Sequence, residues 1–194
     1  MIVQAGDPVL RGRAAEVPVE KITTPEMQAL FDRMIETMRK APGVGLAAPQ
    51  IGIPWRVIVL EDRAELMSKL TPVEIAERGR VAFAPRVLVN PVLRVIDESP
   101  ARFFEGCLSV EGFAAMVPRA SEVEVTGLDR EGHAITWRVR GWPARILQHE
   151  VDHLEGTLYV DRMHTRSFMT MSAARTRFAG QSSADILRGL GLDP

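Results

Sequence analysis

The sequence predicts an α+β domain in which short antiparallel β-sheets surround a buried central helix, with a second helix near the N-terminus. Three stretches support this class. Residues 24–40 place apolar side chains on one helical face, residues 121–141 contain two alternating segments typical of a β-hairpin, and residues 141–156 form a helical pattern that is apolar nearly all round. Because a helix without a polar face has to be covered, this last helix is expected at the centre of the domain.

Residues 24–40 read as an amphipathic helix with a clear beginning. Thr24 is a suitable N-cap, Pro25 suits the first helical position, and the apolar stripe is formed by Met27, Leu30, Phe31, Met34, Ile35 and Met38. The next stretch, APGVGLAAPQIGIP at residues 41–54, is too rich in glycine and proline for a helix and is expected to be a loop. WRVIVL, at residues 55–60, is predicted to be a strand.

Two further regions precede the central helix. Residues 61–80 are polar and charged, and they read as a surface insertion with a short helix at residues 72–78. Nothing in this insertion suggests chemistry. RVLVNPVLRVID, at residues 86–97, is β-branched but interrupted by an Asn-Pro pair, which predicts two short strands or one bent strand. The hairpin that follows is expected to turn at residues 129–132.

The central helix directly follows the hairpin. Pro143 suits its first turn, and Gly156 suits the position just past its end. The sequence after this helix becomes weakly patterned, with a terminal helix expected near residues 184–190. We therefore divide the chain into a main domain at residues 1–164 and a C-terminal tail at residues 165–194.

The composition is that of an ordinary globular chain. Its 194 residues, 46% hydrophobic and 25% charged, fit one domain and exclude a fibrous or disordered protein. The 24 basic and 25 acidic residues give a formal net charge of -1, so no electrostatic case exists for specific nucleic-acid binding. No apolar run is long enough to span a bilayer, and the N-terminal stretch lacks the pattern of a secretory signal. A cytoplasmic location and no membrane partner are therefore expected.

QHEVDHLEG, at residues 148–156, contains an HExxH pattern. His149 and His153 lie four residues apart and share one helical face, with Glu150 beside them as a candidate base. Such pairs also arise by chance in helices that bind no metal. The buried setting favours a metal, because one ion would satisfy both imidazoles. A catalytic zinc-type site normally has three protein ligands and a position for water, so a third ligand is needed.

Cys107 is the candidate for that third ligand. It is the only cysteine, which excludes an intramolecular disulfide, and it lies in FFEGCLSVEGF. A lone cytosolic cysteine is commonly a small buried hydrophobe. Sulfur with two imidazoles is also a recognised ligand set for zinc or ferrous iron. Glu155 and His164 fit less well, because Glu155 lies at the end of the same helix and His164 lies in an unpatterned region.

Three motifs together resemble those of the peptide deformylase family. They are GVGLAAPQIG at residues 43–52, EGCLSV at residues 105–110 and the HExxH motif, in the family's order and approximate spacing. The resemblance extends to about residue 166, and the segments EGFAAMVPR and WPARILQHE are similar to the organellar-type branch and its bacterial relatives. The insertion at residues 61–80 and the longer tail depart from the shorter bacterial enzymes. Because of these two differences, the resemblance does not determine the peripheral contacts or whether the chain is a monomer or a homodimer.

The resemblance implies hydrolysis of the N-formyl group of formyl-methionyl nascent polypeptides, with release of formate. It implies one metal ion per chain held by Cys107, His149 and His153, with Fe2+ as the working metal and Zn2+, Ni2+ or Co2+ as substitutes. A metal ion lowers the pKa of bound water toward about 7, so a metal-bound hydroxide would attack the formyl carbon. Glu150 would act as general base and then as general acid.

The family pattern also implies roles for five residues in the other two motifs. It assigns the oxyanion donors to the Gln50 side-chain amide and the backbone N–H of Leu108. It assigns substrate binding to Val44, Gly45 and Gly106, with the substrate pairing like an added strand. Glycine permits such a close approach. The ordinary alternatives are a loop-stabilising glutamine, a core leucine and a simple turn.

Other charged residues have expected positions. The resemblance implies that Glu105 and Arg119 form an ion pair that supports the cysteine loop; otherwise they are solvated surface charges. His133 and His164 are expected to be exposed and without function. A transient contact with the ribosome, or simply a solvated tail, is consistent with a set of arginines: Arg162, Arg166, Arg175 and Arg177.

Two other functions share part of this pattern. A zincin-type metallopeptidase also uses HExxH, but it would cleave blocked, non-formylated peptides internally. A non-catalytic protein with a structural metal would fill all four ligand positions from the chain and would tolerate Glu150→Gln. A deformylase would not tolerate that change.

Overall fold

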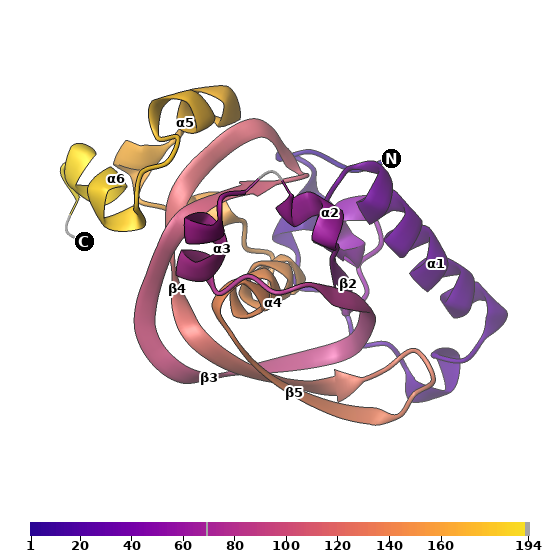
Figure 1. The fold of residues 1–194 in the computed structure, drawn as a ribbon. Coiled ribbons are helices and arrows are strands. Elements are labelled where there is room, and N and C mark those ends of the chain that lie inside the picture. The colour runs from indigo at the N-terminus through magenta and orange to yellow at the C-terminus, as the bar shows by residue number, and fades with distance from the viewer. Residues whose placement is uncertain (69, 193–194) are drawn as a thin grey trace.

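An antiparallel sheet wraps around helix α4 in the computed structural model, which describes residues 1–68 and 70–192 (Figure 1). The strands pair in the order β1-β2-β3-β4-β5, and β6 pairs with β4. Their bounds are β1 Gly45–Ala47, β2 Val57–Asp62, β3 Phe83–Cys107, β4 Val110–Leu128, β5 Ala134–Arg140 and β6 Met169–Thr170. The helices are α1 Pro25–Lys40, α2 Ala64–Met67, α3 Pro72–Arg78, α4 Gly141–Leu154, α5 Met171–Arg177 and α6 Ser183–Gly189. The predicted α+β class with a central helix is confirmed.

Helix α1 begins where the sequence predicts. The Thr24 hydroxyl accepts a hydrogen bond from the Met27 N–H, and Pro25 occupies the first turn, where no N–H is needed. The predicted stripe is buried except for Ile35, which is partly buried. Helix α1 therefore contributes one apolar face to the core.

Strand β2 separates α1 from α4. Val57 and Val59 pack in one cluster with the apolar face of α1, whereas Ile58 and Leu60 pack in a second cluster with Leu147 of α4. Successive side chains of a strand point to opposite faces, so a strand between two helices is apolar throughout. This burial on both faces explains the uninterrupted run of aliphatic residues in the sequence.

Strands β3 and β4 form one bent hairpin that is longer than expected. They contain 25 and 19 residues, and their register shifts between Val89 and Val92. At this shift Asn90 has a φ of 52°, and its side chain bonds both backbone groups of Val17. The sequence predicts a strand only to residue 97, but β3 continues to Cys107. Shifts of this kind bend a strand, which lets the hairpin curve around α4.

The loop predicted at residues 41–54 contains regular structure. Its first part forms β1, with Gly45 opposite Leu60 of β2, and a short 3-10 helix follows at Ala48–Ile51. The prediction of a loop without a strand is wrong here, because pairing with β2 decides the structure more than local propensity does. The strand predicted next is confirmed two residues later, as β2.

The insertion at residues 61–80 is anchored to the core. Helix α3 occupies its predicted residues, and α2 is an additional helix. Asp62, at the end of β2, pairs with Arg80 through two hydrogen bonds, and both side chains are buried. A Cβ atom at Gly141, the first residue of α4, would lie 2.7 Å from the Arg78 carbonyl oxygen. The insertion thus packs directly against the beginning of α4.

The tail packs onto β3 and β4. Strand β6 pairs with β4 beside Phe113, and the predicted terminal helix is confirmed as α6. Phe178, Ile186 and Leu187 form a small core with Met116 of β4. In Figure 1, α5 and α6 lie on the outside of the curved hairpin. Within residues 1–68 and 70–192, no helix has the length and apolar character needed to cross a membrane.

Candidate active site and metal centre

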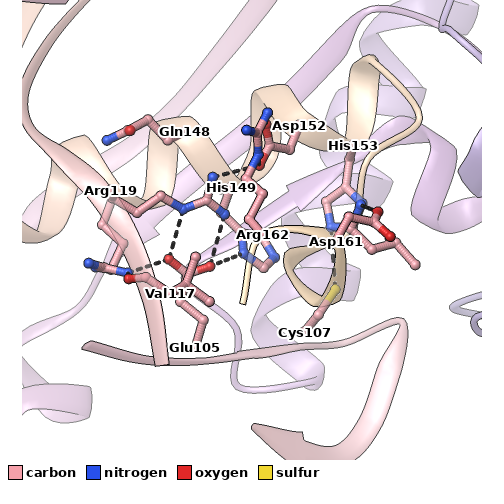
Figure 2. Close-up of polar contacts among 12 residues, drawn as sticks. Glu105, Cys107, Val117, Arg119, Gln148, His149, Asp152, His153, Asp161 and Arg162 are labelled. Carbon is pink, nitrogen blue, oxygen red and sulfur yellow. Dashed lines mark hydrogen bonds and ion pairs between the residues drawn. The ribbon is translucent and has the colours of Figure 1, made fainter. Parts of the chain in front are cut away.

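Three ligand side chains converge from two elements. Cys107 ends β3, while His149 and His153 lie one turn apart on α4 (Figure 2). One possible ligand atom from each residue lies within 4.8 Å of the others, and Cys107 Sγ is 3.3 Å from His153 Nε2. Cys107 precedes His149 by 42 residues in the sequence, and the β3–β4 hairpin brings it to the helix. The three predicted metal ligands are therefore close enough to hold one ion.

His149 is oriented by a buried carboxylate. Its Nδ1 lies 2.9 Å from Glu105 Oε2, which leaves Nε2 for a ligand. Burial alone would raise the pKa of Glu105, but the Arg119 guanidinium and His149 hold that pKa well below its usual range. Burial opposes protonation of His149, yet the contacts with Cys107 and Glu105 raise its pKa well above the usual value. An ionised carboxylate behind a ligating histidine is a common support in metal sites.

Two arginines fix Glu105 in place. Arg119 donates from Nε and Nη2 to the two carboxylate oxygens, both at 3.0 Å, which confirms the predicted pair. Arg145, from the first half of α4, donates to the same carboxylate and to the Val117 carbonyl oxygen. Arg119 also donates to Asp152, which lies beside His153 on α4. This network, in Figure 2, ties β3, β4 and α4 together behind His149.

Glu150 lies on the other side of α4, against β1. Its side chain is buried, and Oε2 has no hydrogen-bond partner among the described residues. Burial raises the pKa of Glu150 to about 7. A Cβ atom at Gly45 would lie 2.7 Å from Glu150 Cδ, so glycine is needed where β1 passes the carboxylate. Burial also lowers the pKa of His153 well below its usual value, which favours the neutral, ligating imidazole.

Gln50 points its amide group at the cysteine loop. Its Oε1 accepts from the Ala47 N–H at 2.8 Å, which directs Nε2 toward Cys107 Sγ at 3.5 Å and Ser109 Oγ at 3.3 Å. Leu108 and Ser109 connect β3 to β4 directly beside this amide. The two residues with expected oxyanion roles, Gln50 and Leu108, therefore come from different loops that meet beside Cys107.

Strand β1 is an edge strand whose outer side is available for pairing. The carbonyl of Val44, the residue before β1, accepts a hydrogen bond from the Glu61 N–H of β2. In an antiparallel pair the hydrogen-bonding residues alternate, so the backbone groups of Gly45 point away from β2. A peptide could extend the sheet at this edge.

Gly106 lies on the opposite face of β3 from Glu105 and Cys107, because side chains alternate along a strand. A Cβ atom there would lie 2.5 Å from Met171 Cε and 3.3 Å from the Phe113 carbonyl oxygen. Met171 begins α5, so the tail covers this face of the cysteine strand. Any side chain at Gly106 would displace Met171.

Several supporting residues are not evident from the motifs. The sequence analysis assigns no role to Arg145 or Asp152, although Arg145 precedes His149 by one helical turn and so shares its face. Tyr159 stacks on the His149 ring at 6.3 Å, and burial raises its pKa to about 12. His133 is exposed as predicted, but the exposed position predicted for His164 is wrong: it is partly buried, because the tail folds back on β4 and its backbone N–H bonds the Met116 carbonyl.

The chain is similar to proteins of one family along most of its length. The family model described as polypeptide deformylase matches residues 1–168. The chloroplastic peptide deformylase 1A of Solanum lycopersicum is 54% identical over 88% of this chain, and the mitochondrial peptide deformylase of Homo sapiens is 47% identical over 86%. This chain spans 61% of the length of the first relative and 69% of the second.

A solved structure agrees with both the sequence match and the fold. The class I type b peptide deformylase of Acinetobacter baumannii, with Met-Ala-Ser bound, superposes with a TM-score of 0.75 at 34% sequence identity. The match covers 84% of this chain and 97% of that one. With the family model, the curated relatives and the fold in agreement, this chain belongs to the polypeptide deformylase family.

Proposed function

We propose that this protein removes the N-formyl group from formyl-methionyl nascent polypeptides by metal-dependent hydrolysis and releases formate. The observation that carries the proposal is the convergence of Cys107, His149 and His153, together with a buried Glu150 oxygen on the same helix that has no partner in the described chain. Membership of the deformylase family supports the same reaction.

The donor set fits a divalent transition metal. One thiolate and two imidazoles suit Fe2+, which we propose as the working metal, with Zn2+, Ni2+ or Co2+ as substitutes. When bound, such an ion supplies the Lewis acidity that activates water at neutral pH. In the described part of the chain the group contains three ligand residues, which supports a catalytic site over a structural site with four protein ligands.

The chain's own residues handle the proton and the developing charge. Glu150 takes a proton from water at its unpartnered oxygen and passes it to the leaving amine nitrogen. Burial makes this carboxyl a weaker acid than usual, which suits both steps near neutral pH. The Gln50 amide and the Leu108 N–H donate to the oxygen of the formyl group as negative charge develops on it.

The formyl peptide binds as an added strand along the free edge of β1. Gly45 offers its backbone groups, with Val44 just before it on the same edge. We also assign substrate binding to Gly106, because it directly precedes the ligand Cys107. The Met-Ala-Ser peptide bound to the A. baumannii relative supports a methionine-first peptide as the ligand. Because Gly45 and Glu150 are in contact, such a peptide would place its N-terminal end near the carboxyl group.

The direct test is formate release from formyl-Met-Ala-Ser by anaerobically prepared, iron-loaded protein. Acetyl-Met-Ala-Ser is the matched control, because it differs only by a methyl group on the same carbonyl carbon. Rapid release of formate, without release of acetate, is expected. Internal cleavage of the acetylated peptide would instead indicate a peptidase, and absence of both reactions in metal-loaded protein would contradict the proposal.

Oxygen sensitivity follows from the same ligand set. A thiolate-bound ferrous ion is exposed to oxidation, either of the metal or of Cys107. We expect aerobic storage to reduce the activity faster than anaerobic storage. Equal decay of two preparations with equal metal content would contradict this expectation.

A transient contact with the ribosome is proposed from the substrate class, and the chain could be a monomer or a homodimer. A cytoplasmic location stays a prediction, because two of the relatives are chloroplastic and mitochondrial proteins.

A further inference from the structure

The N-terminal segment Val3–Ala5 touches both loops that contain the oxyanion donors. The Val3 N–H donates to the Gln50 carbonyl at 2.9 Å. The Ala5 N–H donates to the Ser109 carbonyl at 2.7 Å. These backbone bonds join the two loops, which are otherwise linked by weak contacts of the Gln50 amide.

The side chain of Gln4 adds two bonds to the same turn. Its Nε2 donates to the Leu108 carbonyl at 3.0 Å, and its Oε1 accepts from the Glu111 N–H at 3.3 Å. Both carbonyls of the Leu108–Ser109 connection are therefore occupied by the N-terminal segment. The Leu108 N–H has no backbone partner within residues 1–68 and 70–192, which leaves it available for an anionic oxygen.

The segment is itself fixed at its far end. Gly6, with a φ of 111°, turns the chain, and Asp7 caps a 3-10 helix at Pro8–Arg11 by accepting from the Val9 N–H. Leu10 of this helix is fully buried, and the Ala14 N–H bonds the Leu154 carbonyl at the end of α4. The N-terminal segment thus connects the metal-site helix to the two donor loops.

We infer that Gln4 is a positioning residue for the oxyanion donors, an inference that rests on the proposed function. Donors aimed at developing charge contribute to the rate only when their direction is fixed before the reaction. A two-residue turn has few internal hydrogen bonds, so the bond from Gln4 to the Leu108 carbonyl fixes the peptide unit that directly follows the Leu108 N–H. Gln4 does not contact the metal ligands and does not transfer a proton.

The test compares Gln4→Ala with the wild-type protein in steady-state deformylation. Gln4 is exposed, so the variant is expected to fold with unchanged Tm and metal content. Loss of two exposed hydrogen bonds should reduce kcat about three- to tenfold with little change in KM. Gln181→Ala is the matched control, because Gln181 is an exposed glutamine whose amide bonds a backbone carbonyl in the tail.

A second variant separates the two bonds. Gln4→Glu keeps an acceptor for the Glu111 N–H but removes the donor to the Leu108 carbonyl. We expect it to have the low kcat of Gln4→Ala, whereas hydrogen exchange of the Glu111 amide should accelerate only in Gln4→Ala. Wild-type kcat in Gln4→Ala, or an equal loss in Gln181→Ala, would overturn the inference. Absence of formate release from the wild-type protein would instead overturn the proposed function, and the amide exchange would still report the contact.

Discussion

The two sides of α4 differ in how completely their polar groups are paired. On the side that faces β3 and β4, Glu105, Arg119 and Asp152 are buried and bonded to one another or to His149. We call this the paired side. On the side that faces β1, the buried Glu150 Oε2 has no partner in the described chain. We call this the open side.

The difference separates support from chemistry. An unpaired buried polar atom costs about 1–3 kcal/mol, so the open side lowers stability unless a ligand is present. The paired side avoids that cost and also fixes the direction of His149. We therefore expect changes on the open side to affect catalysis and changes on the paired side to affect folding first.

The largest expected effect is on the open side. Glu150→Gln keeps the size of the side chain but removes the group that accepts and returns a proton. We expect kcat to fall about 10²- to 10⁴-fold with unchanged metal content and with equal or higher Tm. Steady-state kinetics, metal analysis and thermal unfolding on one preparation would check this. Wild-type activity in this variant would mean that Glu150 is not the acid–base catalyst.

Arg119→Met tests the paired side. It removes the buried cation that bridges Glu105 and Asp152, although Glu105 keeps its bonds to Arg145 and His149 and Asp152 keeps its bonds to Arg162. The free energy of unfolding should therefore fall by about 3 kcal/mol, the lower end of the range for breaking a buried ion pair. Iron affinity should also fall, by about 10- to 100-fold, because His149 loses its fixed support. Urea unfolding and metal titration measure these effects. Arg94→Met is the control, since its pair with Glu124 is exposed; an equal loss there would mean that burial of the network is unimportant.

Gly45→Ala tests the contact between β1 and the open side. The new methyl group would lie 2.7 Å from Glu150 Cδ and should displace the carboxyl group. We expect kcat/KM to fall about tenfold or more, since catalytic groups tolerate little displacement. Gly43→Ala is the matched control, because its methyl group would approach no atom more closely than the flexible end of Leu108, at 3.0 Å. Equal activity in the two variants would mean that the close approach of Gly45 to Glu150 does not matter for catalysis.

The smallest expected effect concerns the ion pair between Arg39 and Glu61, which belongs to neither the paired side nor the open side of α4. Hydrogen bonds from Arg39 hold the pKa of Glu61 below its usual value. The folded-state pKa is therefore below the unfolded value of about 4.3, so this stabilisation is present above that pH and is lost as the pH falls through the folded-state pKa.

Because the Arg39 side chain is 45% exposed, solvent screening limits the stabilisation by this pair to about 0.5–1 kcal/mol. The comparison is the free energy of unfolding of the wild-type protein and Glu61→Gln at pH 7 and pH 3. The difference between the two proteins should be smaller at pH 3 than at pH 7. A constant difference at both pH values would contradict the assignment.

Local patterns predicted most of the helices. Thr24-Pro25 marks the start of α1, and Pro72 and Gly156 mark the start of α3 and the end of α4. The same patterns failed for β1 and for the second half of β3. Those segments pair with distant strands, and pairing partners are not encoded in local propensity.

The candidate site was predictable to a similar extent. The motifs indicate Cys107, His149 and His153, and the structure brings them together. Arg145 and Asp152 were not predictable as supports, because a charged residue on a helix is usually exposed and only the curved hairpin buries these two. Gln4 has no local signal at all, since its partners lie more than a hundred residues away.

X-ray absorption at the iron edge of the anaerobically loaded wild-type protein tests the ligand assignment most directly. The convergence of Cys107, His149 and His153 predicts one iron per chain with one sulfur and two imidazole nitrogens from the protein. Cys107→Ala should lose the sulfur signal and most of the metal. A spectrum without sulfur, or full metal content in Cys107→Ala, would contradict the site described for α4 and β3.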